Sequence, residues 1–217
     1  MKRRPAAAGS PAWRVPGSAV RWLKGGGILA FPTDTVPGLG CRAGDGRAVR
    51  TIFRLKGRAG TKPLVVFLPS VAAAARFSGP WSPRVRRLLT ACWPGPLTAI
   101  VRRRRRLPHG VGRGRTVGIR VPAHPLALAL TRRVGPLATT SANVSGRPPL
   151  SNAAAATRLW PDRVLAVPGP RRSRPSTVVD LTRWPPRILR AGALSPAVLA
   201  ARVARAEQAF PPGRRRG

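Results

Sequence analysis

Short apolar runs alternate along the chain with segments whose apolar residues recur every three or four positions. Most of the runs are bounded by Gly, Pro or polar residues, a pattern that is typical of buried strands. We predict strands at residues 28–31, 64–68, 97–101, 116–121, 136–140, 164–167, 177–181 and 187–190.

The segments between these runs have helical spacing, and several begin with a recognisable cap. Val49, Ile52 and Phe53, for example, fall on one face of a helix. We predict helices at residues 46–58, 71–77, 83–92, 124–134, 153–160 and 196–209, with caps at Asp45, Ser70, Ser82, Ser195 and either Ser151 or Asn152. Strands that alternate with helices indicate an α/β domain.

The segment at residues 31–40, FPTDTVPGLG, ends the first predicted strand. Pro32 cannot donate to a sheet, so the strand should stop there and residues 33–35 should open a polar loop. Gly38 and Gly40 would let the backbone approach another group closely. A polar loop after a strand is where open α/β sheets bind ligands. The alternative is a turn whose side chains bond to their own backbone.

The composition fits one domain with two basic ends. At 217 residues the chain is long enough for a substantial core. We expect a disordered basic leader over residues 1–16, a domain over 17–209 and a basic tail over 210–217. No apolar run approaches the ~18 residues of a membrane span. Cys41 and Cys92 lack ligand-spaced partners, so we expect two reduced thiols in a cytoplasmic protein.

The formal net charge of +36 has two possible explanations. Basic side chains supply most non-specific affinity for nucleic acid, so we expect salt-sensitive RNA binding. Only four of the 41 basic residues are lysines, however, and such a preference for arginine also suggests a GC-biased genome. The arginine run at 102–106 is accordingly either a solvated loop or an RNA contact. Two of the rare lysines, Lys56 and Lys62, mark positions that arginine does not suit.

Acidic residues are too few for several classes of enzyme. The chain has five of them, which argues against paired-carboxylate hydrolases and two-metal sites. His109 and His124 belong to no recognisable triad, and the sequence has neither an HExxH nor a Walker motif. The GxGxxxG at 38–44 lacks the carboxylate that dinucleotide binding requires. The remaining cations and hydroxyls suit a substrate that brings its own charge and metal, such as ATP with Mg²⁺.

Six short motifs follow one another along the chain: FPTDTVPGLG at 31–40, KGR at 56–58 with KPL at 62–64, TVGIRVP at 116–122, SANVSG at 141–146, PSTVVD at 175–180 and ILRAG at 188–192. Together they resemble the YrdC family of threonylcarbamoyl-AMP synthases, in its short, single-domain form. The resemblance covers roughly residues 17–205. It implies an α/β fold in which a twisted mixed sheet, flanked by helices, forms a concave and positively charged cavity.

The resemblance also implies a reaction and the residues that carry it. L-threonine, bicarbonate and ATP would give threonylcarbamoyl-AMP and pyrophosphate, the first step of threonylcarbamoyladenosine modification of tRNA. Mg²⁺ would be carried by ATP. The implied ATP-binding residues are Lys56, Arg58, Lys62, Thr116, Ser141, Asn143 and Arg190, of which Lys56 and Arg58 would be catalytic; the implied threonine-binding residues are Thr33, Arg120 and Ser176. The implied partners are tRNA or another RNA and a downstream threonylcarbamoyl transferase, without a membrane.

Two positions depart from the family pattern. Pro37 stands where the family often has an aromatic residue, and Phe67 where many longer members have a histidine near threonine. Two alternative functions remain: an RNA-binding module of the same fold without synthase activity, and a carbamoyl-adenylate enzyme like the related domain of hydrogenase-maturation carbamoyltransferases. Threonine dependence of ATP turnover distinguishes all three.

Overall fold

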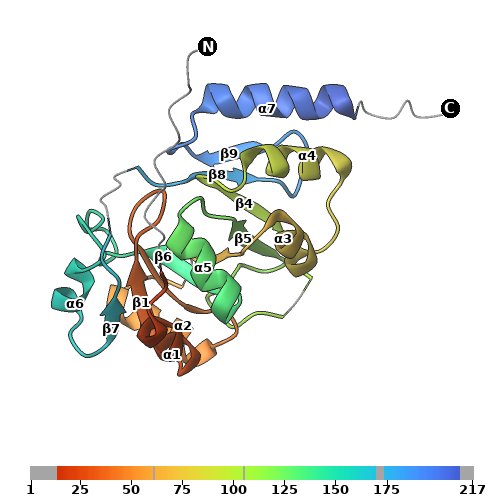
Figure 1. Cartoon of the computed structure of the whole chain (residues 1–217). Helices are drawn as coiled ribbons and strands as arrows, with labels where there is room; N and C mark the ends of the chain where they lie inside the picture. Colours follow the sequence, from red (N-terminus) through yellow and green to blue (C-terminus); the bar gives the residue numbers. More distant parts are fainter. Residues whose placement is uncertain (1–13, 61, 105, 170–173, 211–217) are drawn as a thin grey trace, which may run out of the picture.

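The structure, a computed structural model, describes residues 14–60, 62–104, 106–169 and 174–210. Residues 1–13 of the expected leader, Arg105 of the arginine run and residues 211–217 of the expected tail lie outside these ranges. Within them the chain forms nine strands and seven helices (Figure 1), and no described helix is long and apolar enough to cross a membrane.

The strands form one mixed sheet in the order β7-β1-β2-β6-β3-β5-β4-β8-β9. Three pairs are parallel, β1 with β7, β3 with β5 and β4 with β8, and the other five are antiparallel. The strands are β1 (Ile28–Phe31), β2 (Gly38–Arg42), β3 (Val65–Phe67), β4 (Leu97–Arg102), β5 (Thr116–Arg120), β6 (Leu137–Ser141), β7 (Val164–Ala166), β8 (Thr177–Asp180) and β9 (Arg187–Arg190). The predicted fold class, a mixed sheet flanked by helices, is confirmed.

The predicted caps explain where most helices begin. Side-chain oxygens of Asp45, Ser70, Ser82 and Ser195 accept hydrogen bonds from the first turns of their helices, as predicted. The helices are α1 (Gly17–Lys24), α2 (Gly46–Lys56), α3 (Val71–Ser78), α4 (Pro83–Cys92), α5 (Pro125–Val134), α6 (Ala155–Leu159) and α7 (Pro196–Ala209). Helix α6 is shorter than predicted, with Asn152 Oδ1 accepting from Ala155 N.

The sequence prediction missed two elements, α1 and β2. The predicted loop after Phe31 turns back as strand β2, which pairs with β1 on one side and β6 on the other. Glycine weakens an isolated strand, but a Cβ at Gly40 would lie 3.0 Å from Thr139 Cγ2 and 3.1 Å from Ala138 O. Gly40 therefore gives β2 the space it needs to lie between its neighbours.

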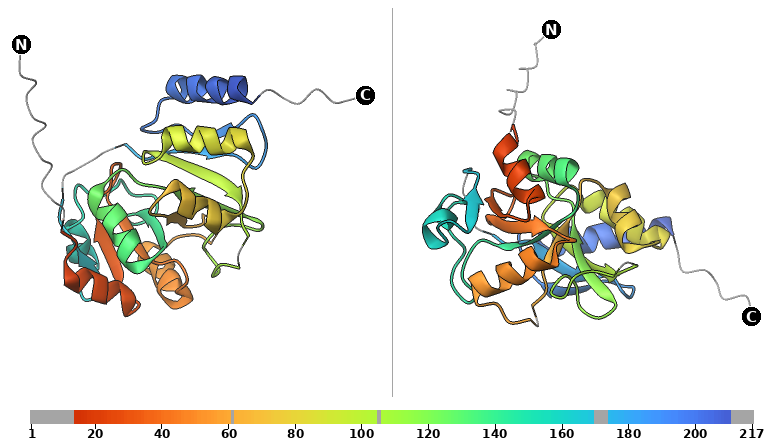
Figure 2. Two further views of the ribbon diagram at one scale, coloured as in Figure 1. Left: turned by 45° about the vertical axis from the view of Figure 1, so that its right-hand side comes forward. Right: turned by 90° about the horizontal axis from the view of Figure 1, so that it is seen from below.

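Alternation along the strands divides the apolar core between the two faces of the sheet. In β1, Ile28 and Ala30 belong to the cluster that includes α2, α3 and α4, while Leu29 and Phe31 belong to the cluster that includes α1 and α5. Figure 2 (right) shows α1 and α5 on one side of the strands and α2 on the other. Helix α7 packs against α4 at one end of the molecule (Figure 1).

The cap of α2 gives a direct stability test. Asp45 Oδ1 accepts from Arg47 N at 3.0 Å and from Ala48 N at 2.9 Å. Asp45→Ala should lower the free energy of unfolding by about 1 kcal/mol, measured by urea denaturation, because two helix donors lose their acceptor. Asp45→Asn keeps an acceptor and should remain close to wild type. Equal losses in both variants would contradict the capping role.

Candidate active site

A cavity of about 290 Å³ lies on the same sheet face as α1 and α5. Phe67 lies between this cavity and the apolar core under α1 and α5: it packs in the core cluster that includes these helices and also lines the cavity. Six of the ten residues predicted to bind ATP or threonine line it: Thr33, Arg58, Arg120, Ser141, Ser176 and Arg190. Segments far apart in the sequence therefore meet in one cavity.

The loop between β1 and β2 is a compact turn held by its own hydroxyl groups. Thr33 Oγ1 donates to Val36 O at 2.7 Å and accepts from Thr35 N at 3.0 Å. Thr33 and Thr35 are both buried, and both line the cavity. The sequence allows either a turn bonded to its own side chains or a loop that faces a ligand. The structure shows a self-bonded turn that also faces the cavity.

Arg120, the most buried cation of the cavity, has a partner for each of its nitrogens. Nε donates to Gly95 O at 3.0 Å, Nη1 donates to Thr35 Oγ1 at 2.9 Å, and Nη2 lies 2.7 Å from Asp34 Oδ1. Burial lowers the pKa of Arg120, while the charge of Asp34 acts in the opposite direction. Asp34 therefore stabilises the guanidinium in its charged, oriented form.

Asp34 was not among the predicted site residues. The signal that could have identified it is its rarity, because it is one of only five acidic residues and stands beside Thr33. Phe67 also contacts the same guanidinium, whose central carbon lies 5.4 Å from the ring centroid. The side chain that departs from the family pattern thus takes part in holding Arg120 through a cation–π contact.

Arg58 and Arg190 add two cations, and among the described residues no carboxylate lines the cavity to balance them. Arg58 Nε donates to Lys62 O at 2.6 Å, and Arg190 Nη2 donates to Ser176 O at 2.8 Å. Burial lowers the pKa of half-buried Arg58, and the charge of Arg190 lowers it further. Arg190 is exposed at the rim, yet partial desolvation also lowers its pKa. An anion between the two would relieve their mutual repulsion.

Hydroxyl groups complete the lining on the β4–β8 side. Thr98 and Ser176 are both buried, and their Oγ atoms lie 2.9 Å apart. Gly118, which lies opposite Ile100 in the sheet, carries no side chain; a Cβ there would lie 3.2 Å from Ile100 Cδ1 and 3.4 Å from Val65 Cγ2. The lining on this side therefore combines the paired hydroxyl groups of Thr98 and Ser176 with the apolar side chain of Val65.

Lys56 lies behind the cavity lining, where it holds the loop after β6. Its side chain is 1 % exposed, and Nζ donates to Ser141 O at 2.5 Å, to Asn143 O, and to Asn143 Oδ1 at 3.3 Å. Burial lowers the pKa of Lys56 to about 8, with a smaller contribution from Arg58. The group is still mostly an ammonium ion at neutral pH, and its three protons match these three acceptors. In this arrangement Lys56 positions Ser141, and its contact with phosphate stays a prediction.

Three further predicted ATP ligands are not among the residues that line the cavity. Lys62 is exposed, and its carbonyl orients Arg58. Asn143 Oδ1 accepts from Ser141 Oγ at 2.6 Å. Thr116 begins β5, four residues before Arg120 and thus roughly 13 Å along the strand. Their roles in nucleotide binding stay predictions.

No group of three potential His, Cys, Asp or Glu metal ligands occurs among the described residues. The cavity instead offers guanidinium and hydroxyl groups, which are donors for anionic oxygen atoms. Chemically, the arrangement can bind phosphates and carboxylates and can stabilise negative charge that develops on them.

Comparisons with known proteins agree with this chemistry. The Sua5/YciO/YrdC family model, described as telomere recombination, matches residues 21–192. A protein of Laribacter hongkongensis named threonylcarbamoyl-AMP synthase is 42% identical over 171 residues, which are 77% of this chain and 91% of the relative.

Two solved structures with bound ligands share the fold. The crystal structure of Pyrococcus abyssi Sua5 complexed with L-threonine has a TM-score of 0.75 and 35% identity, and the match covers 81% of this chain and 53% of that one. Full-length HypF in its phosphate- and nucleotide-bound form has a TM-score of 0.69 and 26% identity, covering 81% of this chain and 28% of that one. The match over most of its length shows that this chain belongs to the Sua5/YciO/YrdC family.

Proposed function

We propose that the protein is an L-threonylcarbamoyladenylate synthase, which makes threonylcarbamoyl-AMP and pyrophosphate from L-threonine, bicarbonate and ATP. The observation that carries this proposal is the convergence of Arg58, Arg120 and Arg190 on one cavity, which no carboxylate of the described residues lines. Relatives that cover most of this chain are named threonylcarbamoyl-AMP synthase, which supports the same reaction.

Arg120 is suited to hold the carboxylate of threonine. A guanidinium has five N–H groups: Arg120 Nε donates to Gly95 O and Nη1 donates to Thr35 Oγ1, while Nη2 forms the ion pair with Asp34. At least one N–H on each of Nη1 and Nη2 is left for a ligand, and a carboxylate can accept from two such donors in bidentate fashion. Thr33 and Ser176, which line the same cavity, would bind the rest of the amino acid.

Arg58 and Arg190 are suited to hold the phosphates of ATP, together with Ser141 at the cavity wall. Lys62, Thr116 and Asn143 would complete the nucleotide site in the bound state. Mg²⁺ would enter as part of the ATP substrate and would offset part of the phosphate charge. The chain then needs to supply positioning and positive charge, which phosphoryl and nucleotidyl transfer mainly require.

The reaction joins the two substrates at the α-phosphorus. The amine of threonine and bicarbonate form a carbamate, with loss of water. A carbamate oxygen attacks the α-phosphorus, the bond to the β-phosphate oxygen breaks, and pyrophosphate leaves with the electron pair. Arg58 and Arg190 would stabilise the charge that develops on the phosphate oxygens, and Arg120 would keep the amino acid in line for attack.

The product would serve the first step of threonylcarbamoyladenosine modification of tRNA. A downstream threonylcarbamoyl transferase would then consume the adenylate, and the protein would act in the cytoplasm. A contact with tRNA or another RNA is supported by the net charge of +36, since basic surfaces attract the phosphate backbone.

The identity of the products tests the proposed function. With ATP, Mg²⁺, bicarbonate and L-threonine, chromatography and mass spectrometry should detect pyrophosphate and threonylcarbamoyl-AMP. Both should require threonine and bicarbonate together. Serine should be the poorer substrate by only a modest factor, because one methyl group is worth about 1–3 kcal/mol. ADP as the main product, or turnover indifferent to threonine, would leave an RNA-binding module as the better description.

A matched pair of variants compares the contribution to turnover of an arginine in the cavity with that of an arginine on the surface. Arg58→Ala should cost at least about 2 kcal/mol of transition-state stabilisation, roughly a 30-fold loss in kcat/KM for ATP, because a preorganised charge is removed. Arg104→Ala removes an exposed arginine that does not line the cavity and should leave turnover nearly intact. Equal losses in the two variants would contradict a special role for Arg58.

A further inference from the structure

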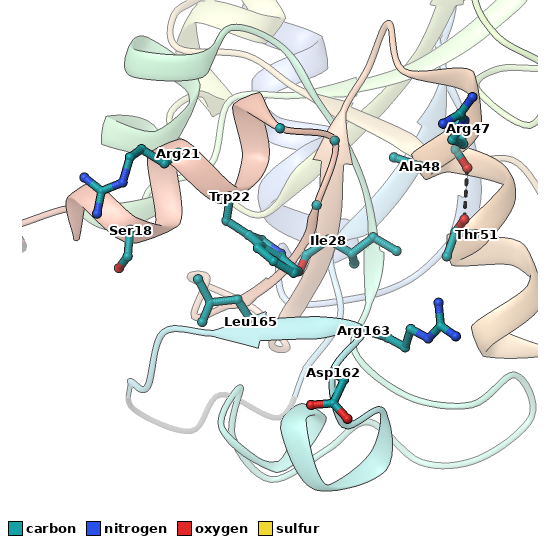
Figure 3. A pocket seen from close by; sticks show the side chains of 13 residues that line it. Ser18, Arg21, Trp22, Ile28, Arg47, Ala48, Thr51, Asp162, Arg163 and Leu165 are labelled. Atoms are coloured by element: carbon teal, nitrogen blue, oxygen red, sulfur yellow. Dashed lines mark hydrogen bonds between the residues drawn. The ribbon is translucent and has the colours of Figure 1, made fainter.

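A second hollow lies at the opposite end of β1 from the active-site cavity. It has a volume of about 690 Å³ and is bounded by α1, the glycine run at 25–27, the start of α2 and strand β7 (Figure 3). Ile28 at its wall and Thr33 at the cavity are five residues apart, roughly 16 Å along an extended chain. A ligand here would leave the active-site cavity open.

The side chain of Trp22 forms a fixed aromatic platform in this hollow. Its Nε1 donates to Ile28 O at 2.8 Å, and the ring lies directly over Gly27. A Cβ at Gly27 would come within 2.5 Å of Trp22 Cδ1 and Cε2, so only glycine allows the ring to rest there. Trp22 is nevertheless 39% exposed. The glycine run, whose role the active site does not explain, thus creates an oriented and accessible aromatic surface.

Three arginines line the same hollow as this platform. Arg47 and Arg163 lie on one side of Trp22 and Arg21 on the other (Figure 3). Within the described part of the chain, none of these guanidinium groups forms an ion pair with a carboxylate. Asp162 lines the hollow as well, so three positive charges face one negative charge.

The exposed indole and the neighbouring arginines together indicate which kind of ligand the hollow can bind. An exposed, fixed indole stacks with planar rings, and arginines on both sides bind phosphate groups. Together these are the features of sites for single-stranded nucleic acid, in which a base stacks and the backbone contacts cations. A base inside a duplex has no free face for such stacking, because its neighbours cover it.

We propose that Trp22 stacks an unpaired RNA base while Arg47 and Arg163 bind the adjacent phosphates. This inference rests on the RNA contact proposed above and gives it a location, and it requires no synthase activity. Bound RNA and the substrates of the cavity can be held at the same time.

A binding assay with two probes separates stacking from charge. Fluorescence anisotropy would follow a labelled 12-residue oligoadenylate and an abasic oligoribonucleotide of the same length. Trp22→Leu keeps an apolar side chain but removes the aromatic plane, so it should weaken binding of oligoadenylate about tenfold and leave the abasic probe unchanged. The double variant R47Q/R163Q should weaken both probes and reduce the slope of log K against log salt by about 0.7 for each lost phosphate contact.

Trp81→Leu is the matched control, since Trp81 also lies among arginines but in a different pocket. Photocrosslinking of a 4-thiouridine oligonucleotide, with peptide mapping, should identify Trp22 or its neighbours in the wild-type protein, whether or not Trp22→Leu folds. Unchanged oligoadenylate affinity in a folded Trp22→Leu variant, or crosslinks confined to Trp81 or the 102–104 segment, would overturn the proposal. Synthase products from Trp22→Leu at the wild-type rate would show that only the RNA site was altered.

Discussion

Burying positive charge where carboxylates are scarce is the constraint on which the active site depends. Desolvating a guanidinium is unfavourable unless hydrogen bonds and an opposite charge compensate for it. Arg120 is almost fully buried, and Asp34, Thr35 and the carbonyl of Gly95 all serve this one side chain. The carboxylate of Asp34 and the hydroxyl group of Thr35, both in the turn after β1, compensate for the desolvation of Arg120. The same turn forms the cavity wall.

The two remaining cavity arginines are stabilised differently. Arg58 and Arg190 are held by backbone carbonyl groups, which orient a guanidinium without cancelling its charge. The cavity therefore combines one neutralised cation, fixed in direction, with two cations whose charge remains available. This division matches the proposed substrates, a single carboxylate at Arg120 and a triphosphate with its metal at Arg58 and Arg190.

Local signals allowed most of the fold to be predicted from the sequence. Asp45, Ser82 and Ser195 are adjacent to the helix donors that they cap, so their roles can be recognised without knowledge of the fold. Strand β2 could not be recognised in this way. Its glycines are tolerated because Phe31 and Thr139 occupy the space beside Gly40, and these neighbours lie in two other strands.

The sequence indicated many of the residues that line the cavity, but it did not indicate which of them contact one another. The rarity of lysine singles out Lys56, but its acceptors at Ser141 and Asn143 are more than eighty residues away, and no spacing rule predicts such a pairing. The ion pair of Asp34 with Arg120 escaped prediction for the same reason. Phe67 was noted only as a departure from the family pattern, because its contact with Arg120 depends on the pairing of β3 with β5.

The most direct test of the division between neutralised and available cations is a crystal structure with L-threonine and a non-hydrolysable ATP analogue. The threonine carboxylate should bind Arg120 while Asp34 remains paired with it, and the phosphates should contact Arg58 and Arg190. A nucleotide bound outside the cavity, or a threonine carboxylate away from Arg120, would contradict the account.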